Sequence, residues 1–226
     1  MSEEQLSLFP EMKPPELEAE LPLYRPFLPG VKPEEAYLEV KSLAALAGIM
    51  AGCSKCGLRE GCRQVVFADG NPQARLMFVG EGPGQVEDEQ GLPFVGRAGQ
   101  LLNRILKAAS LEREEVYITN VVKCRPPGNR LPNPDEVAAC RGCLEAQIRL
   151  VKPNIIVCLG LLATRAILDG RATMATIRGK WFTRQGILLM ATYHPAALLR
   201  REELKRPTWE DFKLIRDRYL EVKRGD

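Results

Sequence analysis

The chain has 226 residues, of which 45% are hydrophobic and 27% are charged, and this composition excludes a disordered chain and a collagen-like one. Its length favours one domain with an appendage, or two small domains. The longest apolar run, residues 155–163, has about half of the roughly 20 residues that span a bilayer. The N-terminus lacks the apolar core of a secretory signal, so we expect a cytoplasmic protein without membrane contact.

Charge and proline divide the chain into a tail and a body. Residues 1–40 hold nine acidic and three basic residues, whereas residues 41–226 hold 20 acidic and 29 basic ones. Seven of the 17 prolines also lie in the first 40 residues, where they disfavour helices and central strands. We therefore interpret residues 1–33 as an acidic, Pro-rich tail and linker, and residues 34–226 as the folded domain. A basic body is typical of proteins that bind a polyanion such as nucleic acid.

Strand-like and helix-like segments alternate along the folded domain. A first helix is expected over residues 34–51, after Pro33. Short runs rich in β-branched residues predict strands at residues 75–80, 116–122, 155–160 and 187–193. Helices are predicted at residues 99–109, 134–151, 161–169 and 203–223, with a hairpin or loop at residues 178–185. The alternation indicates a parallel sheet flanked by helices, with ligands at the carboxyl ends of the strands.

Two segments that follow predicted strands are candidates for a functional site. The first is Gly80-Glu81-Gly82-Pro83-Gly84, whose glycines let backbone amides approach a ligand closely. Its spacing matches neither the dinucleotide fingerprint nor the P-loop, and a plain turn between strand and helix is the alternative. The second is His194, the only histidine, at the end of the last predicted strand, for which a structural role and a catalytic role both stay open.

The seven cysteines suggest a metal site, because a cytoplasmic protein rarely uses disulfides. Two C-x-x-C pairs, Cys53 with Cys56 and Cys140 with Cys143, resemble two zinc knuckles. An iron–sulfur cluster held by four thiolates is the alternative. Cys158 lies inside an apolar predicted strand and is expected to be a buried thiol.

Five sequence blocks between about residues 53 and 200 resemble the family 4 uracil-DNA glycosylases, the iron–sulfur branch of that superfamily. The blocks are CSKC at 53–56, GEGPGQVED at 80–88, GLPFVG at 91–96, YITNVVKCRPP at 117–127 and YHPAALLR at 193–200. The resemblance implies a 4Fe–4S cluster, which replaces the interpretation of the two C-x-x-C pairs as zinc knuckles. Its implied ligands are Cys53, Cys56, Cys124 and Cys140, with Cys62 and Cys143 as further thiols nearby.

The same resemblance implies a pocket for a uracil base that has been flipped out of DNA. The backbone amides of Gly80–Gly82 would hold the base, and Phe94 would stack on its face. The Asn120 amide would pair with O4 and N3–H, a pattern that cytosine reverses in part. Glu87 would exclude the methyl group of thymine. His194 would donate a hydrogen bond to O2, where negative charge grows as the glycosidic bond breaks.

Further residues of the matching blocks imply contacts with water and DNA. Leu198 would fill the gap that the flipped base leaves in the stack, and Arg200 would lie near phosphate. The best-known branch of the superfamily has an aspartate where this chain has Gly82. Glu81 is the nearest carboxylate in sequence that could position the attacking water, and a role only in organising the loop is the alternative. A related branch bonds covalently to DNA through a histidine, but residues 126–134 contain none, which favours hydrolysis.

The tail holds a short motif outside this resemblance. Gln5-Leu6-Ser7-Leu8-Phe9 resembles the pentapeptide with which bacterial repair and replication proteins bind the sliding clamp. Leu8 and Phe9 are adjacent apolar anchors, and Gln5 supplies an amide for polar contacts. The proline-rich stretch that follows would act as a semi-rigid spacer. A chance apolar cluster is the alternative.

Together these patterns predict an α/β fold: a three-layer α/β/α sandwich with a central, mainly parallel four-stranded sheet. The expected function is hydrolytic removal of uracil from single- or double-stranded DNA by a monomer, which leaves an abasic site and opens base-excision repair. One alternative is the same fold acting on other deaminated bases. The other is an iron–sulfur or zinc module that binds nucleic acid without chemistry.

Overall fold

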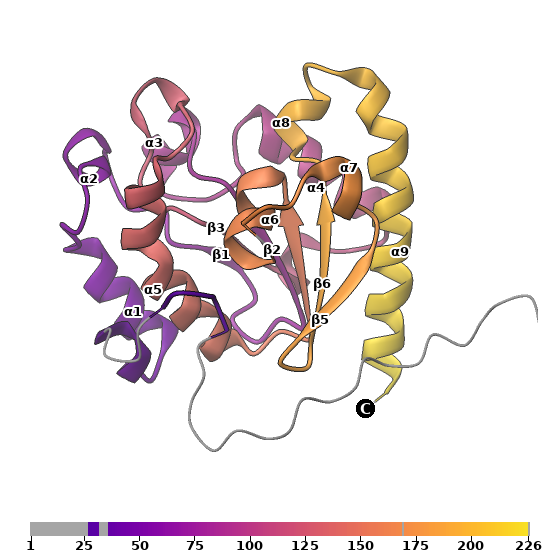
Figure 1. The fold of residues 1–226 in the computed structure, drawn as a ribbon, viewed down its shortest axis with the longest axis horizontal. Coiled ribbons are helices and arrows are strands. Elements are labelled where there is room, and N and C mark those ends of the chain that lie inside the picture. The colour runs from indigo at the N-terminus through magenta and orange to yellow at the C-terminus, as the bar shows by residue number, and fades with distance from the viewer. Residues whose placement is uncertain (1–26, 32–35, 169, 226) are drawn as a thin grey trace, which may run out of the picture.

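The computed structural model describes residues 27–31, 36–168 and 170–225. A six-stranded sheet forms its centre, and helices surround this sheet (Figure 1). The strand order is β1-β3-β2-β4-β6-β5. The strands are β1 (Asp69–Gly70), β2 (Leu76–Gly80), β3 (Tyr117–Asn120), β4 (Ile155–Leu159), β5 (Trp181–Arg184) and β6 (Ile187–Thr192). The candidate clamp-binding residues Gln5, Leu6, Leu8 and Phe9 lie outside the described residues.

The four predicted strands form the parallel centre of this sheet, but the prediction of four strands in all was wrong. Strands β1 and β5 add an antiparallel partner at each edge. β1 has only two residues, too few for a periodic pattern. β5 is only partly buried and forms a hairpin with β6 through Gln185 and Gly186, which both have positive φ, as a two-residue hairpin turn requires.

The strand register brings the functional segments to one edge of the sheet. Gly80, the last residue of β2, pairs with Asn120, the last residue of β3. Farther across the sheet, Leu159 of β4 pairs with Thr192 of β6, two residues before His194. The predicted base-binding residues therefore meet at the carboxyl ends of parallel strands, where α/β sheets bind their ligands.

The helices cover both faces of the sheet and include the predicted ones. The helix predicted at residues 134–151 is found at its predicted bounds, with Pro134 in its first turn and a capping box between Asn133 and Glu136. The predicted helix at 34–51 is in part a 3-10 turn, η2 (Ala36–Glu39), before α1. The α-helices are α1 (Leu43–Ala51), α2 (Leu58–Gly61), α3 (Gln85–Gln90), α4 (Arg97–Ala108), α5 (Pro134–Val151), α6 (Leu161–Ile167), α7 (Met174–Ile177), α8 (Pro195–Leu198) and α9 (Lys205–Arg224). Within the described ranges, none of these helices has both the length and the apolar character that crossing a membrane needs.

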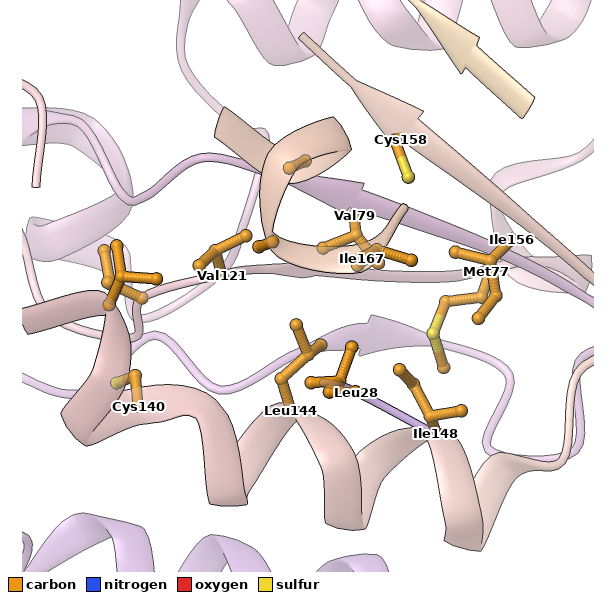
Figure 2. Close-up of a cluster of buried hydrophobic side chains, with 14 of the residues drawn as sticks. Leu28, Met77, Val79, Val121, Cys140, Leu144, Ile148, Ile156, Cys158 and Ile167 are labelled. Atoms are coloured by element: carbon orange, nitrogen blue, oxygen red, sulfur yellow. The ribbon is translucent and has the colours of Figure 1, made fainter. Parts of the chain in front are cut away.

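Two apolar clusters, one on each face of the sheet, confirm the predicted three-layer sandwich. On one face α5 and α6 contribute Leu144, Ile148 and Ile167, which pack on Met77 and Val79 of β2 (Figure 2).

On the other face α4 and α9 contribute Leu102, Leu106 and Phe212, which pack on Leu76 and Phe78. Successive β2 residues thus point to opposite faces, as the pleat requires. Both faces are apolar, which is typical of a parallel central strand.

The segment 27–31 packs against the domain, although the sequence analysis assigns it to the linker. Phe27, Leu28 and Val31 are buried in the same cluster as α5. The backbone amides of Phe27 and Leu28 donate hydrogen bonds of 2.8 and 2.7 Å to the buried Glu145 carboxylate. This carboxylate therefore fixes where the chain enters the folded body.

We predict that Glu145→Ala lowers the free energy of unfolding by about 2 kcal/mol or more, because two buried amides lose a charged acceptor. Urea denaturation measures the change. Glu114→Ala, at an exposed position, is the matched control and should have a much smaller effect. Equal losses in the two variants would contradict the prediction.

Candidate functional site

A cavity of about 490 Å³ lies at the carboxyl ends of β2 and β3. Its walls come from the loop after β2, the α3–α4 loop, the β3–α5 loop and helix α8. Of the predicted base-binding residues, all except Gly80 line it, together with Arg200: Glu81, Gly82, Glu87, Phe94, Asn120 and His194. Residues that lie far apart in the sequence thus line one cavity.

Gly80 lies directly beneath this cavity and permits a close approach. A Cβ atom at this position would be 2.4 Å from Asn120 Oδ1 and 2.4 Å from Phe94 Cζ, shorter than any tolerable contact. Any larger residue would push the amide and the aromatic ring apart. Glycine is required here for lack of space, since its backbone φ is not positive.

The backbone around Phe94 is held in place from several sides. Phe94 has a left-handed φ of 54°, and its carbonyl group would lie 1.9 Å from a Cβ at Gly99. Arg113 donates hydrogen bonds to the carbonyl oxygens of Pro93 (2.7 Å) and Phe94 (3.3 Å). Arg113 is itself paired with Asp69 of β1 at 2.7 Å. The short edge strand therefore helps to fix the aromatic wall of the cavity.

Glu87 supports the same loop from inside. Its buried carboxylate accepts hydrogen bonds from the amides of Val95 (3.0 Å) and Gly96 (2.7 Å), at the start of α4. Carboxylates are favourable at a helix N-terminus because they satisfy its free N–H groups. The structure thus gives Glu87 a positioning role for the Phe94 loop, which the motif alone does not reveal.

Asn120 presents an unsatisfied acceptor in the cavity wall. The residue is 2% exposed, and its Oδ1 atom has no hydrogen-bond partner. An unpaired buried acceptor costs about 1–3 kcal/mol, so a donor from a ligand would restore that energy. The amide is therefore poised to accept a hydrogen bond from a bound base.

Lys123, which is not among the predicted site residues, fixes the backbone at Asn120. Its side chain is fully buried, and Nζ donates hydrogen bonds to the Asn120 carbonyl oxygen and to Thr119 Oγ1. Burial lowers the pKa of Lys123, and the neighbouring Cys143 and Cys140 raise it. The only signal in the sequence is a lysine directly after an apolar run.

His194 is held as a neutral donor. The residue is the N-cap of α8, and its Nδ1 atom accepts a 3.1 Å hydrogen bond from the Ala196 amide, so the proton of the neutral ring is on Nε2. Burial, with a smaller effect from the positive charge of Arg200, lowers the pKa of His194 to about 4. The ring centroid is 5.5 Å from that of Phe94.

Glu81 and Arg200 line the same cavity as this histidine and carry opposite charges. Burial raises the pKa of Glu81, and the charge of Arg200 partly counters that rise. Both side chains line the cavity, and Arg200 is exposed to solvent. Glu81, which can accept a proton, and Arg200, which can bind an anion, therefore lie at the same cavity.

The structure does not present Leu198 at the surface. This predicted DNA-inserting residue is 2% exposed, whereas its neighbour Leu199 is 39% exposed. The α8 turn directs Leu198 towards the protein interior, because consecutive helical residues point about 100° apart. The DNA-inserting role that the motif implies for Leu198 stays a prediction.

The cysteines gather on the α5 side of the sheet. Cys53 and Cys56 lie between α1 and α2 and are partly buried, while Cys124 and Cys140 are buried. Burial raises the pKa of Cys140, and Cys56 and Cys53 raise it further. The pKa of Cys124 is raised by burial, by Cys62, and by Cys140 and Cys56. Cys62, Cys124 and Cys140 belong to one core cluster, and Cys56 packs against it.

The second C-x-x-C pair is divided between two parts of the core. Cys140 belongs to the cluster that includes Leu144, whereas Cys143 packs with Leu46 and Met50 of α1. In the portions of the chain with described positions, no three His, Cys, Asp or Glu side chains are arranged around a single ion. Cys158 is buried in β4, as the sequence analysis expects.

Comparison with known proteins agrees with this arrangement. The family model of the uracil DNA glycosylase superfamily matches residues 67–213. A type-4 uracil-DNA glycosylase of Sulfurisphaera tokodaii is 43% identical over 192 residues, which cover 81% of this chain and 87% of the relative. One of Thermotoga maritima is 46% identical over 71% of this chain and 86% of the relative. One of Archaeoglobus fulgidus is 42% identical over 78% of this chain and 92% of the relative. The resemblance found in the sequence is thereby confirmed, and the chain belongs to the uracil DNA glycosylase superfamily.

Proposed function

We propose that this protein excises uracil from DNA by hydrolysing the N-glycosidic bond, which leaves an abasic site for base-excision repair. Relatives named type-4 uracil-DNA glycosylases match most of the chain at 40–46% identity. The observation that carries the proposal is the unpaired Oδ1 of Asn120. Asn120 lines a cavity whose walls also include the Phe94 ring and the neutral His194 imidazole.

Base selection follows from the polarity of the Asn120 amide. Its Oδ1 atom accepts from N3–H of uracil, while its NH₂ group donates to O4. Cytosine has an acceptor at N3 and a donor at N4, so it would leave polar groups unpaired at about 1–3 kcal/mol each. The Phe94 ring stacks on the base, and the backbone amides of Gly80–Gly82 hold it in place. Glu87, fixed by the Val95 and Gly96 amides, excludes the methyl group of thymine.

Bond cleavage is assisted where negative charge develops. As the bond between C1′ and N1 breaks, its electron pair passes to the uracil ring, and His194 Nε2–H donates to O2. A fixed donor costs no reorganisation at that moment. Water then adds to C1′ and gives a proton to the Glu81 carboxylate. The low pKa of His194 keeps it neutral, so the Ala196 amide continues to orient it.

DNA is the substrate, and Arg200 is the residue that we assign to phosphate. Flipping a base costs a few kcal/mol in unstacking and unpairing, and a pocket that stacks and pairs the base offsets that cost. The exposed Arg200 guanidinium at the cavity can bind the phosphate beside the flipped nucleotide. One chain supplies the base-reading amide, the carboxylate and the imidazole, so a monomer suffices for the reaction.

We also propose a 4Fe–4S cluster on Cys53, Cys56, Cys124 and Cys140. The mutual electrostatic effects among these thiols support a shared site. In such a cluster each thiolate binds a different iron, and their sulfurs therefore lie farther apart than around one ion. The buried Lys123 lowers the pKa of Cys140, which favours the thiolate that iron needs. Bound there, the cluster would link the α1–α2 segment to β3 and α5.

For His194→Ala we expect the single-turnover rate constant of uracil release to fall about a hundredfold to a thousandfold, with little change in DNA affinity. In the unmodified protein the rate should fall as the pH is lowered towards 4, because protonation of His194 removes the Nδ1 acceptor from the Ala196 amide. Protonation of Glu81, whose pKa is raised by burial, removes the proton acceptor in the same direction. Quench-flow kinetics and binding anisotropy test both points. Lys180→Ala, on an exposed loop, serves as control. An unchanged rate in His194→Ala would remove His194 from the mechanism.

For Cys140→Ser we expect loss of iron together with a lower melting temperature, because the metal closes a long loop. Anaerobically purified protein should contain about four irons per chain and absorb visible light. Cys158→Ser changes another buried cysteine, in β4, and should keep its iron. Zinc without iron in the unmodified protein, or full iron in Cys140→Ser, would exclude the proposed cluster.

A last proposal concerns a partner, the bacterial sliding clamp, which Gln5, Leu6, Leu8 and Phe9 would bind. We expect a peptide of residues 1–12 to bind the clamp with micromolar affinity, since a short segment must become ordered on binding. In the full chain, Leu8→Ala with Phe9→Ala should abolish clamp binding in calorimetry. Excision on short oligonucleotides should continue. Equal binding by the double variant would show that the motif is not used.

A further inference from the structure

The β3–α5 loop, residues 126–132, carries an unusually exposed leucine. Leu131 is 64% exposed, whereas the other six large exposed hydrophobic residues in the described structure are 37–45% exposed. Leu131 also lines the cavity together with Pro126 and Pro132. A side chain that both lines the cavity and is largely exposed must lie at its mouth.

Ion pairing holds this leucine outward. Arg130 donates two hydrogen bonds, of 2.8 and 2.6 Å, to the Glu136 carboxylate, and a third of 2.9 Å to the Leu131 carbonyl oxygen. Glu136 Oε2 also accepts from the Asn133 amide at 2.7 Å. The loop is thereby anchored to the first turn of α5. Leu131 is fixed on both sides in sequence rather than carried on a free loop.

The backbone before Leu131 is constrained as well. Gly128 and Asn129 both have positive φ, of 60° and 57°. The Asn129 amide donates to the Pro126 carbonyl oxygen at 3.0 Å, and the Asn129 side chain accepts from Arg125 Nε at 2.8 Å. A tight turn with this many internal bonds is pre-organised, so little order is gained when it meets a ligand.

We propose that Leu131 is the side chain that enters the DNA base stack beside the flipped nucleotide. Proteins that open a duplex insert apolar wedges between base steps, and a wedge must be exposed before DNA arrives. Leu131 meets this condition at the cavity mouth, while Leu198 is buried. Leu199 is exposed but does not line the cavity. This inference rests on the proposed excision of uracil from duplex DNA.

The test compares duplex with single-stranded substrate, because a wedge acts only where a stack must be held open. Single-turnover rate constants are measured for the unmodified protein, Leu131→Ala, Leu131→Met and Leu199→Ala on the same uracil-containing strand with and without its complement. We expect Leu131→Ala to lower the duplex-to-single-strand ratio of rate constants about tenfold or more. Leu131→Met should restore most of it, and Leu199→Ala should keep the ratio of the unmodified protein.

A second readout follows flipping directly. The fluorescence of 2-aminopurine next to the uracil should rise when unmodified protein binds the duplex, and Leu131→Ala should reduce that rise. An equal loss on both substrates would overturn the proposal, as would a duplex-specific loss in Leu199→Ala instead. Release of uracil from single strands by the unmodified protein reports the proposed function separately. Its absence would refute excision, whereas an unchanged ratio in Leu131→Ala would refute only the wedge.

Discussion

The base site depends on one close approach at the end of β2. Asn120 and Phe94 reach the same side of Gly80 only because residue 80 has no Cβ, which would lie 2.4 Å from each of them. The strand register supplies one of these groups, since Gly80 pairs directly with Asn120. The α3–α4 loop supplies the other, and Glu87 and Arg113 hold that loop through its backbone. The amide that would pair with a base and the aromatic ring that would stack on it thus meet at Gly80.

Lys123 connects this contact point to the cysteine region. Its ammonium group donates to the Asn120 carbonyl oxygen on one side. On the other side its charge partly counters the burial that raises the pKa of Cys140 and Cys143. A fully buried cation needs compensating partners, and here the Asn120 carbonyl oxygen and Thr119 Oγ1 accept its hydrogen bonds. The surroundings of the cysteines therefore influence the position of the Asn120 amide, although Asn120 lies in β3 and Cys140 and Cys143 lie in α5.

The sequence predicts the parts of the structure that repeat a local pattern. The four apolar strands and α5, which has proline and a capping box at its start, leave signals within a few residues. Motif resemblance likewise identifies Phe94, Asn120 and His194. The edge strand β1 and the burial of Leu198 depend on neighbours distant in sequence, so no local pattern reveals them. The same holds for the support that Arg113 gives to the Phe94 loop.

The charge of Arg200 acts on the pKa of two buried groups at once, and a bound DNA phosphate would offset that charge. Its charge lowers the pKa of His194 and limits the rise in the pKa of Glu81. A phosphate bound to Arg200 would offset that charge, and both pKa values would then rise. A histidine with an ordinary pKa near 6.5 would become partly protonated at neutral pH under such a shift, and Nδ1 would lose the Ala196 hydrogen bond. Burial is nevertheless the larger cause of the low pKa of His194, and a phosphate on Arg200 leaves that cause in place. The imidazole therefore stays a neutral, oriented donor after the substrate has bound.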